Sequence, residues 1–283
     1  MDRFSKYNPK ATFSFFLIEI LLTIVIFNPI MLAVSFVSAF VYKLKLEGRG
    51  AFLYLLKFIL PLVLLVTVFN FAFSHYGMTI LFVFCDMNFT AESFFYGFTQ
   101  GLLLGSAVMW FSCYSSVITA ERFIAVFGRI MPNTALVFSM VLSFIPRLKK
   151  NAAEISDARL LIDGENKIKK SINSFSALIT MTLEQSIETA DSMKARGYSK
   201  DRNIYSKYRF SVQDLLLIIF TVFSGAVLLV LKWLGRFDFL FDPIIKMQGF
   251  SVYAVILFAI LSLLPVIIDF LEDMRWFYLK QKI

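Results

Sequence analysis

The sequence predicts an all-α integral membrane protein with about six transmembrane helices and two long cytoplasmic helices. Hydrophobic residues make up 58% of the chain and charged residues only 17%, a composition that soluble domains of this length do not have. Five apolar regions reach the roughly 20 residues that a helix needs to cross a bilayer. Most of the 28 Lys and Arg residues lie between these regions, where they indicate the orientation of the chain in the membrane.

The N-terminal membrane part is predicted to cover residues 1–118, with helices at 13–27, 29–42, 54–73 and 94–118. The first two helices come from one apolar region that Asn28-Pro29 interrupts. Because proline lacks an N–H and disfavours helix in the residue before it, we expect a tight membrane hairpin here. A single kinked helix is the alternative. No small-residue cleavage pattern follows the first helix, so we expect a retained span and not a signal peptide.

The middle of the chain, residues 119–209, is predicted to be a cytoplasmic region, because it is too long for a simple connection between membrane helices. It opens with an amphipathic helix at 119–128, in which Phe123, Val126 and Phe127 share one face. Residues 133–145 are almost wholly apolar but too few to span a bilayer. We therefore expect them to be buried against the membrane helices.

Two long polar helices are predicted in the rest of this region, at about 147–163 and 174–196. Pro146 is expected to precede the first helix, and Gly164 and Gly197 to follow the two helices. Neither helix buries enough surface to be stable alone, so each needs the other and a partner. The apolar stripes expected to carry this packing are Leu148, Ala152 and Ile155 in the first helix and Leu183, Ile187 and Ala190 in the second.

The C-terminal part, residues 210–283, is predicted to hold two membrane helices, at 212–234 and 250–271, and a basic tail. Basic residues gather at the N-terminus, after the second helix, in the middle region and in the tail, whereas the predicted external segment 74–93 has none. Because cytoplasmic loops retain positive charge, both termini and the middle region are predicted to be cytoplasmic. The net charge of +8 is then a topology signal and does not indicate nucleic-acid binding.

Both long polar helices finish with the pair Ala-Arg, at Ala158-Arg159 and at Ala195-Arg196-Gly197. The planar guanidinium of arginine binds a carboxylate with two hydrogen bonds and is well suited to a protein interface. A glycine after the second pair permits the positive φ of a helix C-cap. The alternative is that both arginines only interact with the negative end of their own helix dipole.

Several segments together resemble the transmembrane (T) component of energy-coupling factor (ECF) transporters, which import cobalt and vitamins. The resemblance spans most of the chain. The segments that carry it are Asn8-Pro9-Lys10, Glu121 to Ile124, Pro132, Ser143 to Arg147, Ala158-Arg159, Ala190 to Tyr198, and Arg209 with Asp214.

This resemblance implies a non-catalytic scaffold in a bacterial or archaeal cell (inner) membrane, which holds two cytosolic ABC-type ATPase subunits through a crossed pair of coupling helices. It also implies a separate substrate-binding membrane (S) subunit that selects a vitamin or a transition-metal ion. In that family each coupling helix carries an Ala-Arg-Gly signature whose arginine docks in one ATPase. Ala195, Arg196 and Gly197 match the signature fully, whereas Leu160 follows Ala158 and Arg159 in place of glycine.

Gly97, Gly101 and Gly105 recur at every fourth position of the predicted helix 94–118. Helices in lipid associate through close packing, which small residues at this spacing permit. The three glycines therefore predict a packing face. Its neighbour is either another helix of this chain, the interpretation we favour, or a partner subunit.

Glu19 is the only ionisable residue well inside the first predicted span. Acidic residues within membrane segments are costly and usually functional. Glu19 either pairs with a polar group, relays a proton, or lies near the membrane interface, since the apolar region begins only six residues before it.

The sequence holds no G-x-x-x-x-G-K-[ST] segment, so ATP hydrolysis is expected in a partner and not in this chain. Cys85 and Cys113 lack the spacing of a disulfide framework or metal site, and no catalytic residues or cofactor are predicted.

We therefore expect a non-enzymatic membrane subunit, embedded in lipid. A secondary transporter that works alone is the main alternative, although unequal halves and sparse intramembrane polarity are untypical of that class. A membrane-embedded enzyme is a second alternative.

Overall fold

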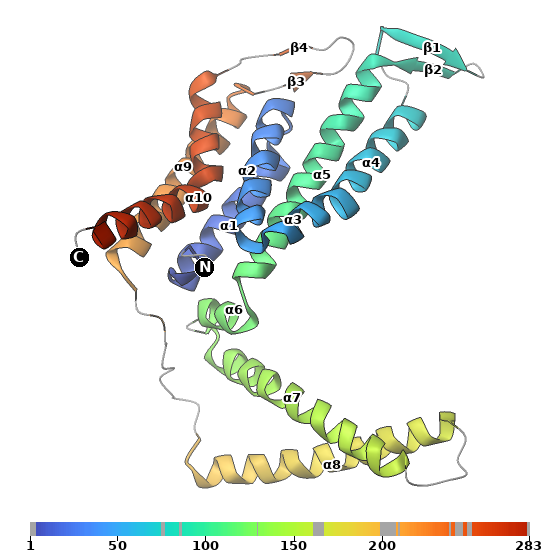
Figure 1. Cartoon of the computed structure of the whole chain (residues 1–283), viewed down its shortest axis with the longest axis vertical. Helices are drawn as coiled ribbons and strands as arrows, with labels where there is room; N and C mark the ends of the chain where they lie inside the picture. The colour runs from blue at the N-terminus through green and yellow to red at the C-terminus, as the bar shows by residue number, and fades with distance from the viewer. Residues whose placement is uncertain are drawn as a thin grey trace. The chain divides into compact units, whose positions relative to one another are not determined.

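The computed structural model describes residues 4–74, 77–84, 87–128, 130–160, 167–198, 208, 210–237, 239–240, 246–247 and 251–281. These residues are predominantly helical (Figure 1). The chain divides into two compact units. We call Met1–Thr119 with Tyr208–Ile283 the membrane unit, and Ala120–Lys207 the insert.

Five helical segments among the described residues are long and apolar enough to cross a membrane, and all of them belong to the membrane unit. They are α2 (Pro29–Glu47), the continuous segment Arg49–Phe73, α5 (Ala91–Val117), α9 (Val212–Trp233) and Val252–Met274 of α10 (Val252–Gln281). The helix α1 (Pro9–Val25) has 17 residues, at the lower end of spanning length. Helix length and hydropathy thus make this a multi-pass membrane protein.

The first apolar region is broken at Asn28-Pro29: α1 ends at Val25 and α2 begins at Pro29, which excludes the single kinked helix. Both helices begin at the proline of an Asn-Pro dipeptide, Asn8-Pro9 for α1 and Asn28-Pro29 for α2. Each asparagine side chain accepts a hydrogen bond from a backbone N–H two residues on, at 3.1 Å for Asn8 and 3.0 Å for Asn28. Proline fits the first helical position, where no N–H partner is needed.

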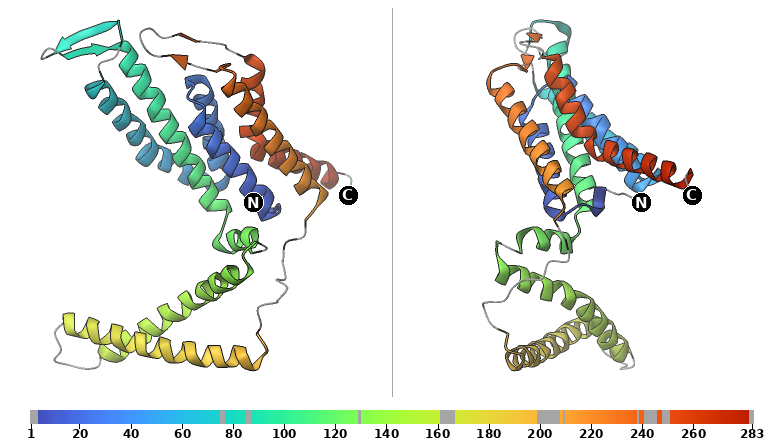
Figure 2. Two further views of the ribbon diagram at one scale, coloured as in Figure 1. Left: turned by 180° about the vertical axis from the view of Figure 1, so that it is seen from behind. Right: turned by 90° about the vertical axis from the view of Figure 1, so that its left-hand side faces the viewer.

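Prolines also shape the segment Arg49–Phe73 and α10. The segment consists of α3 (Arg49–Tyr54), a π-helical turn, η2 (Leu55–Ile59), and α4 (Leu60–Phe73), and the N–H of Leu60 bonds to the carbonyl of Leu55, five residues back. Pro61 is the second residue of α4, two positions after this turn. In α10, Pro265 lies inside a helix that is bent (Figure 2), as expected where proline removes an N–H from the ladder.

Two short antiparallel hairpins lie at one end of the membrane unit (Figure 1). The first pairs β1 (Ile80–Phe84) with β2 (Met87–Thr90), within the predicted external segment 74–93, and the second pairs β3 (Phe239–Leu240) with β4 (Lys246–Met247). Neither hairpin was predicted. A run of five apolar residues at 80–84 is a strand-length signal that could have indicated the first.

The core of the membrane unit contains a cluster of aromatic side chains around α1. Phe4, Phe15, Phe16, Tyr42 and Trp110 are all fully buried. Their rings meet edge to face, with centroids 5.4 Å apart for Phe4–Phe15 and 5.9 Å apart for Phe15–Trp110. Each such pair stabilises the fold by about 0.5–1.5 kcal/mol in addition to the effect of its buried apolar area. The cluster joins the N-terminal segment to α1, α2 and α5. Around it, α1 also packs against α9, and α2 against α10.

The insert consists of α6 (Ala120–Phe127), α7 (Pro132–Leu160) and α8 (Lys167–Ala195). The predicted break before residue 147 was wrong, because α7 begins at Pro132 and continues through Pro146. A proline removes one hydrogen bond, and long helix-favouring segments on both sides are enough to continue the helix past it. The segment 133–145 is therefore the first half of α7. Four of its apolar side chains are exposed, namely Val137, Phe138, Val141 and Ile145, whereas Ala135 is buried.

Candidate functional site

The candidate site is the pair of long helices in the insert. Figures 1 and 2 show α7 and α8 crossing, with their carboxyl-terminal ends on opposite sides of the crossing. Asn151 Nδ2 of α7 donates a hydrogen bond of 3.4 Å to Gln185 Oε1 of α8. Leu148, Ala152 and Ile155 are half-buried along α7, on the stripe that the sequence predicts for this packing.

The packing face of α8 differs from the predicted one. Its half-buried residues include Ala177, Leu178, Thr182 and Gln185. The predicted stripe of Leu183, Ile187 and Ala190 is exposed. Leu183 and Ile187 instead continue a long exposed apolar row, whose other members are Ile168, Ile172, Phe175 and Ile179.

This exposed row follows helical spacing, so it forms one face of α8 over most of its length. Ile168, Phe175 and Ile187 are 77%, 64% and 65% exposed. An unpaired apolar face of this length on a polar helix is typical of a surface that another molecule covers. Periodicity alone did not show which of the two apolar faces of α8 packs against α7.

The end of α8 has a well-defined cap at Gly197. Gly197 has φ of 69°, the left-handed conformation that glycine adopts without strain. Its N–H donates to the carbonyl of Lys194 at 3.0 Å, and the N–H of Tyr198 donates to that of Met193 at 3.1 Å. These two bonds form a Schellman motif. Arg196 is its C-cap residue, and Gly197 is the left-handed residue that follows.

The cap leaves Arg196 presented at the tip of α8. The side chain is exposed, and among the described residues it makes no ion pair or hydrogen bond. A β-carbon added at Gly197 would meet no atom within 4 Å, so the surface beside Arg196 is open.

The first Ala-Arg pair lies in the last turn of α7, since Ala158 and Arg159 precede the end of that helix at Leu160. Ala158 is exposed. The predicted stop at Gly164 lies outside the described residues, as does Arg209. The structure thus places Arg159 and Arg196 at the carboxyl-terminal ends of two crossing helices.

The three glycines of α5 lie against α4. A β-carbon at Gly97 would stand 2.7 Å from Asn70 Cβ, at Gly101 2.8 Å from the backbone oxygen of Val63, and at Gly105 2.8 Å from Val63 Cγ2. These distances are shorter than real contacts. Close approach of α4 and α5 therefore requires glycine at all three positions, and the neighbour of this face is a helix of the same chain.

Within the membrane unit, the side chain of Glu19 is fully buried. Its Oε1 lies 2.5 Å from Ser262 Oγ of α10. Separate polar contacts link α1 to α2 and α2 to α5: Thr23 Oγ1 lies 3.0 Å from Ser35 Oγ, and the Trp110 Nε1–H donates to Ser35 Oγ at 2.9 Å. Apolar periodicity gave no signal for these contacts.

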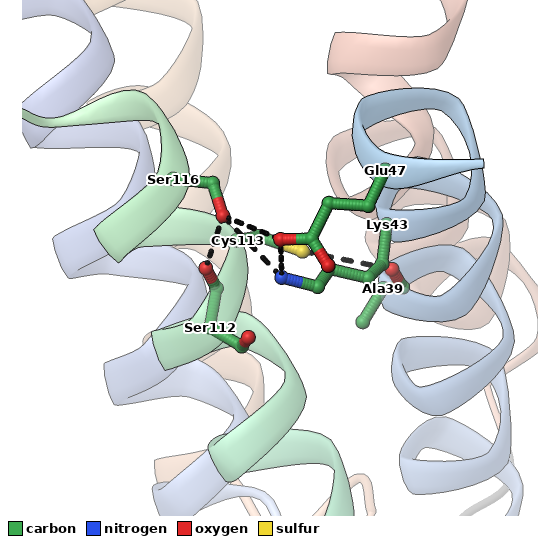
Figure 3. A network of polar contacts seen from close by, with 6 residues as sticks. All are labelled: Ala39, Lys43, Glu47, Ser112, Cys113 and Ser116. Atoms are coloured by element: carbon green, nitrogen blue, oxygen red, sulfur yellow. Dashed lines mark hydrogen bonds and ion pairs between the residues drawn. The ribbon is translucent and has the colours of Figure 1, made fainter. Parts of the chain in front are cut away.

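A second polar group joins the ends of α2 and α5 (Figure 3). The buried ammonium of Lys43 donates to Glu47 Oε1, and to Ser116 Oγ at 3.3 Å. Ser116 Oγ in turn donates to Glu47 Oε1 at 3.0 Å. Nearby, the thiol of the buried Cys113 faces the backbone oxygen of Ala39 at 3.7 Å. Cys85 lies outside the described residues.

Two carboxylates near span ends, Asp214 and Asp269, hold the N-terminal segment. Asp214 accepts from the backbone N–H of Asn8 at 2.9 Å, and Asp269 from that of Phe4 at 3.0 Å. Asp269 also forms an ion pair with Lys45, at 3.4 Å. Burial, and then the negative charges of Glu272, Asp214 and Asp269, raise the pKa of Tyr7 in this segment.

Among the described residues, no three His, Cys, Asp or Glu side chains are grouped as metal ligands. A scan against models of known protein families found no match, and a search of curated protein sequences found no similar protein.

Proposed function

We propose that this protein is the scaffold and energy-coupling transmembrane subunit of an ECF-type ABC importer. It links two cytosolic ATPases to a substrate-binding membrane subunit for uptake of a vitamin or a transition-metal ion. The chain crosses a bacterial or archaeal cell membrane six times, α1 included, with both termini in the cytoplasm. ATP hydrolysis takes place in the partners.

The observation that carries this proposal is the pair of crossing helices α7 and α8, each with an Ala-Arg pair at its carboxyl end. The exposed Arg196 has its full complement of donors available for a carboxylate. Because the carboxyl ends point away from each other, the two arginines suit two separate partners.

The exposed apolar row of α8 also supports a partner-binding role. Isolated amphipathic helices gain little stability from their own sequence, so a helix of this length with an open apolar face benefits from a covering protein. Stiff helices can transmit rigid-body movement of such partners to the membrane helices.

Charge reversal at both arginines tests this proposal. The full chain with Arg159→Glu and Arg196→Glu, purified in mild detergent from its own host, should keep normal membrane insertion but lose two co-purifying ATPases. Mass spectrometry identifies the ATPases by their phosphate-binding sequences. The matched control is Lys149→Glu with Lys169→Glu, which makes the same charge change at exposed positions of the same helices and should retain both ATPases.

Normal recovery of both ATPases with the arginine variant would contradict the proposed contacts. Transport by the purified chain alone in liposomes, driven by an ion gradient, would instead establish a secondary transporter.

A further inference from the structure

Glu19 is an isolated carboxyl group inside the membrane unit. It is fully buried, and its Oε2 has no hydrogen-bond partner among the described residues. Its Oε1 lies 2.5 Å from Ser262 Oγ. This contact joins α1 to α10, two helices from opposite ends of the chain.

The hydroxyl of Ser262 has two acceptors and one proton. Its Oγ lies 2.9 Å from the backbone oxygen of Phe258, one turn earlier in α10, as well as 2.5 Å from Glu19 Oε1. A hydroxyl donates one hydrogen bond and accepts others. If Ser262 donates to Phe258, the proton in the short contact must come from Glu19.

An ionised Glu19 would leave a charged oxygen without a donor in the membrane core, which costs several kcal/mol. The neighbouring polar groups do not supply that donor. Thr23 Oγ1 donates to the backbone oxygen of Glu19 at 2.8 Å, and Trp110 donates to Ser35. The first bond runs to the backbone and the second to the hydroxyl of Ser35, so neither reaches the carboxyl group of Glu19.

Among the described residues, no charged side chain forms an ion pair with Glu19 either. The described ionisable side chains of the helices around α1 lie near or beyond the ends of the membrane spans: Lys43, Lys45 and Glu47 of α2, Glu92 of α5, Asp214 and Lys232 of α9, and Asp269, Glu272, Asp273 and Lys280 of α10.

From this geometry we propose that Glu19 is a proton-binding site in the membrane core, and that the bound proton joins α1 to α10. The carboxylic O–H donates to Ser262 Oγ, and the Ser262 O–H donates to the carbonyl of Phe258. Loss of the proton leaves an uncompensated charge between the two helices and weakens their contact. This inference does not depend on the proposed transport function.

Infrared spectroscopy of the full chain in detergent tests the protonation directly. The wild-type protein should show the C=O stretch of a protonated carboxyl group at neutral pH, and Glu19→Gln should lose this band. Glu188→Gln, at an exposed position of α8, should keep it. A wild-type spectrum without any protonated-carboxyl band at neutral pH would overturn the proposal, whether or not a variant folds.

Thermal unfolding as a function of pH gives the second measurement. A carboxyl that keeps its proton when folded but loses it when unfolded stabilises the protein fully below the ordinary glutamate pKa of about 4.3. That contribution shrinks as pH rises, so the wild-type unfolding midpoint should shift downwards. Glu19→Gln keeps a neutral donor for Ser262 and should flatten this part of the profile, whereas Glu188→Gln should not. An unchanged pH slope in Glu19→Gln would contradict the proposal.

Discussion

The backbone N–H of Asn8 donates a hydrogen bond of 2.9 Å to Oδ1 of Asp214. The other carboxylate oxygen, Oδ2, accepts from the N–H of Ser211 at 2.8 Å and completes a capping box at the start of α9. One buried side chain therefore caps α9 and holds the residue that caps α1. The two membrane helices are fixed to each other at their first turns.

Asp214→Ala should lower the unfolding midpoint of the protein in detergent, because it removes a cap and leaves the N–H of Asn8 without this acceptor. Loss of a cap costs about 0.5–2 kcal/mol, and a buried unsatisfied group adds about 1–3 kcal/mol. Asp214→Asn keeps one acceptor oxygen, so its unfolding midpoint should lie between those of the wild type and Asp214→Ala. The control Asp191→Ala removes an exposed carboxylate whose ion pair with Lys194 is 4.0 Å long, and should change the midpoint little.

Gly101→Ala should separate α4 from α5. The added β-carbon would stand 2.8 Å from the backbone oxygen of Val63, and a backbone atom cannot move away as a flexible side chain can. Overpacking of this kind costs about 1–3 kcal/mol. In the control Gly50→Ala, the nearest atom is Glu47 Cβ at an ordinary 3.8 Å. Thermal unfolding should show a loss for Gly101→Ala only, and equal midpoints would show that the helices are not in close contact.

Glu47→Ala should destabilise the protein more than Lys43→Met, although both break the same ion pair. The side chain of Lys43 is 3% exposed and that of Glu47 40%. Without Glu47, a buried ammonium loses its counter-charge, which costs about 3–5 kcal/mol. Without Lys43, the carboxylate of Glu47 can hydrate. The two unfolding midpoints in detergent measure this asymmetry, and the reverse order would show that Lys43 is not buried as described.

Patterns along the chain were sufficient to locate the membrane helices and the break at Asn28-Pro29, because span length and proline chemistry are local properties. They were not sufficient at Pro146. There the cost of one missing hydrogen bond competes with the helix propensity of the residues on both sides, and α7 continues. Local patterns also cannot show which of two apolar faces meets a neighbour, and the stripe predicted to pack in α8, Leu183, Ile187 and Ala190, is exposed.

Polar contacts between distant parts of the chain were the least predictable. Asp214 and Asp269 lie near span ends, where no local pattern indicates a long-range contact, yet both are buried and accept hydrogen bonds from backbone N–H groups of the N-terminal segment. The Glu19–Ser262 contact joins residues 243 positions apart. In contrast, the left-handed φ of Gly197 was predictable, because a glycine directly after a helical run is itself the signal for such a cap.

Gly197→Ala should loosen the last turn of α8 and the presentation of Arg196. A residue with a β-carbon at φ of 69° is strained by roughly 1–2 kcal/mol, so the hydrogen bonds made by Gly197 and Tyr198 should open more often. Hydrogen exchange of these two amides should become faster in the alanine variant, and recovery of the proposed ATPases should fall.

Asparagine tolerates the left-handed conformation better than alanine, so Gly197→Asn is the matched control and should stay close to the wild type in both measurements. Slow exchange in the alanine variant would show that the cap does not need glycine. Faster exchange with full ATPase recovery would show that the tip of α8 is not the contact.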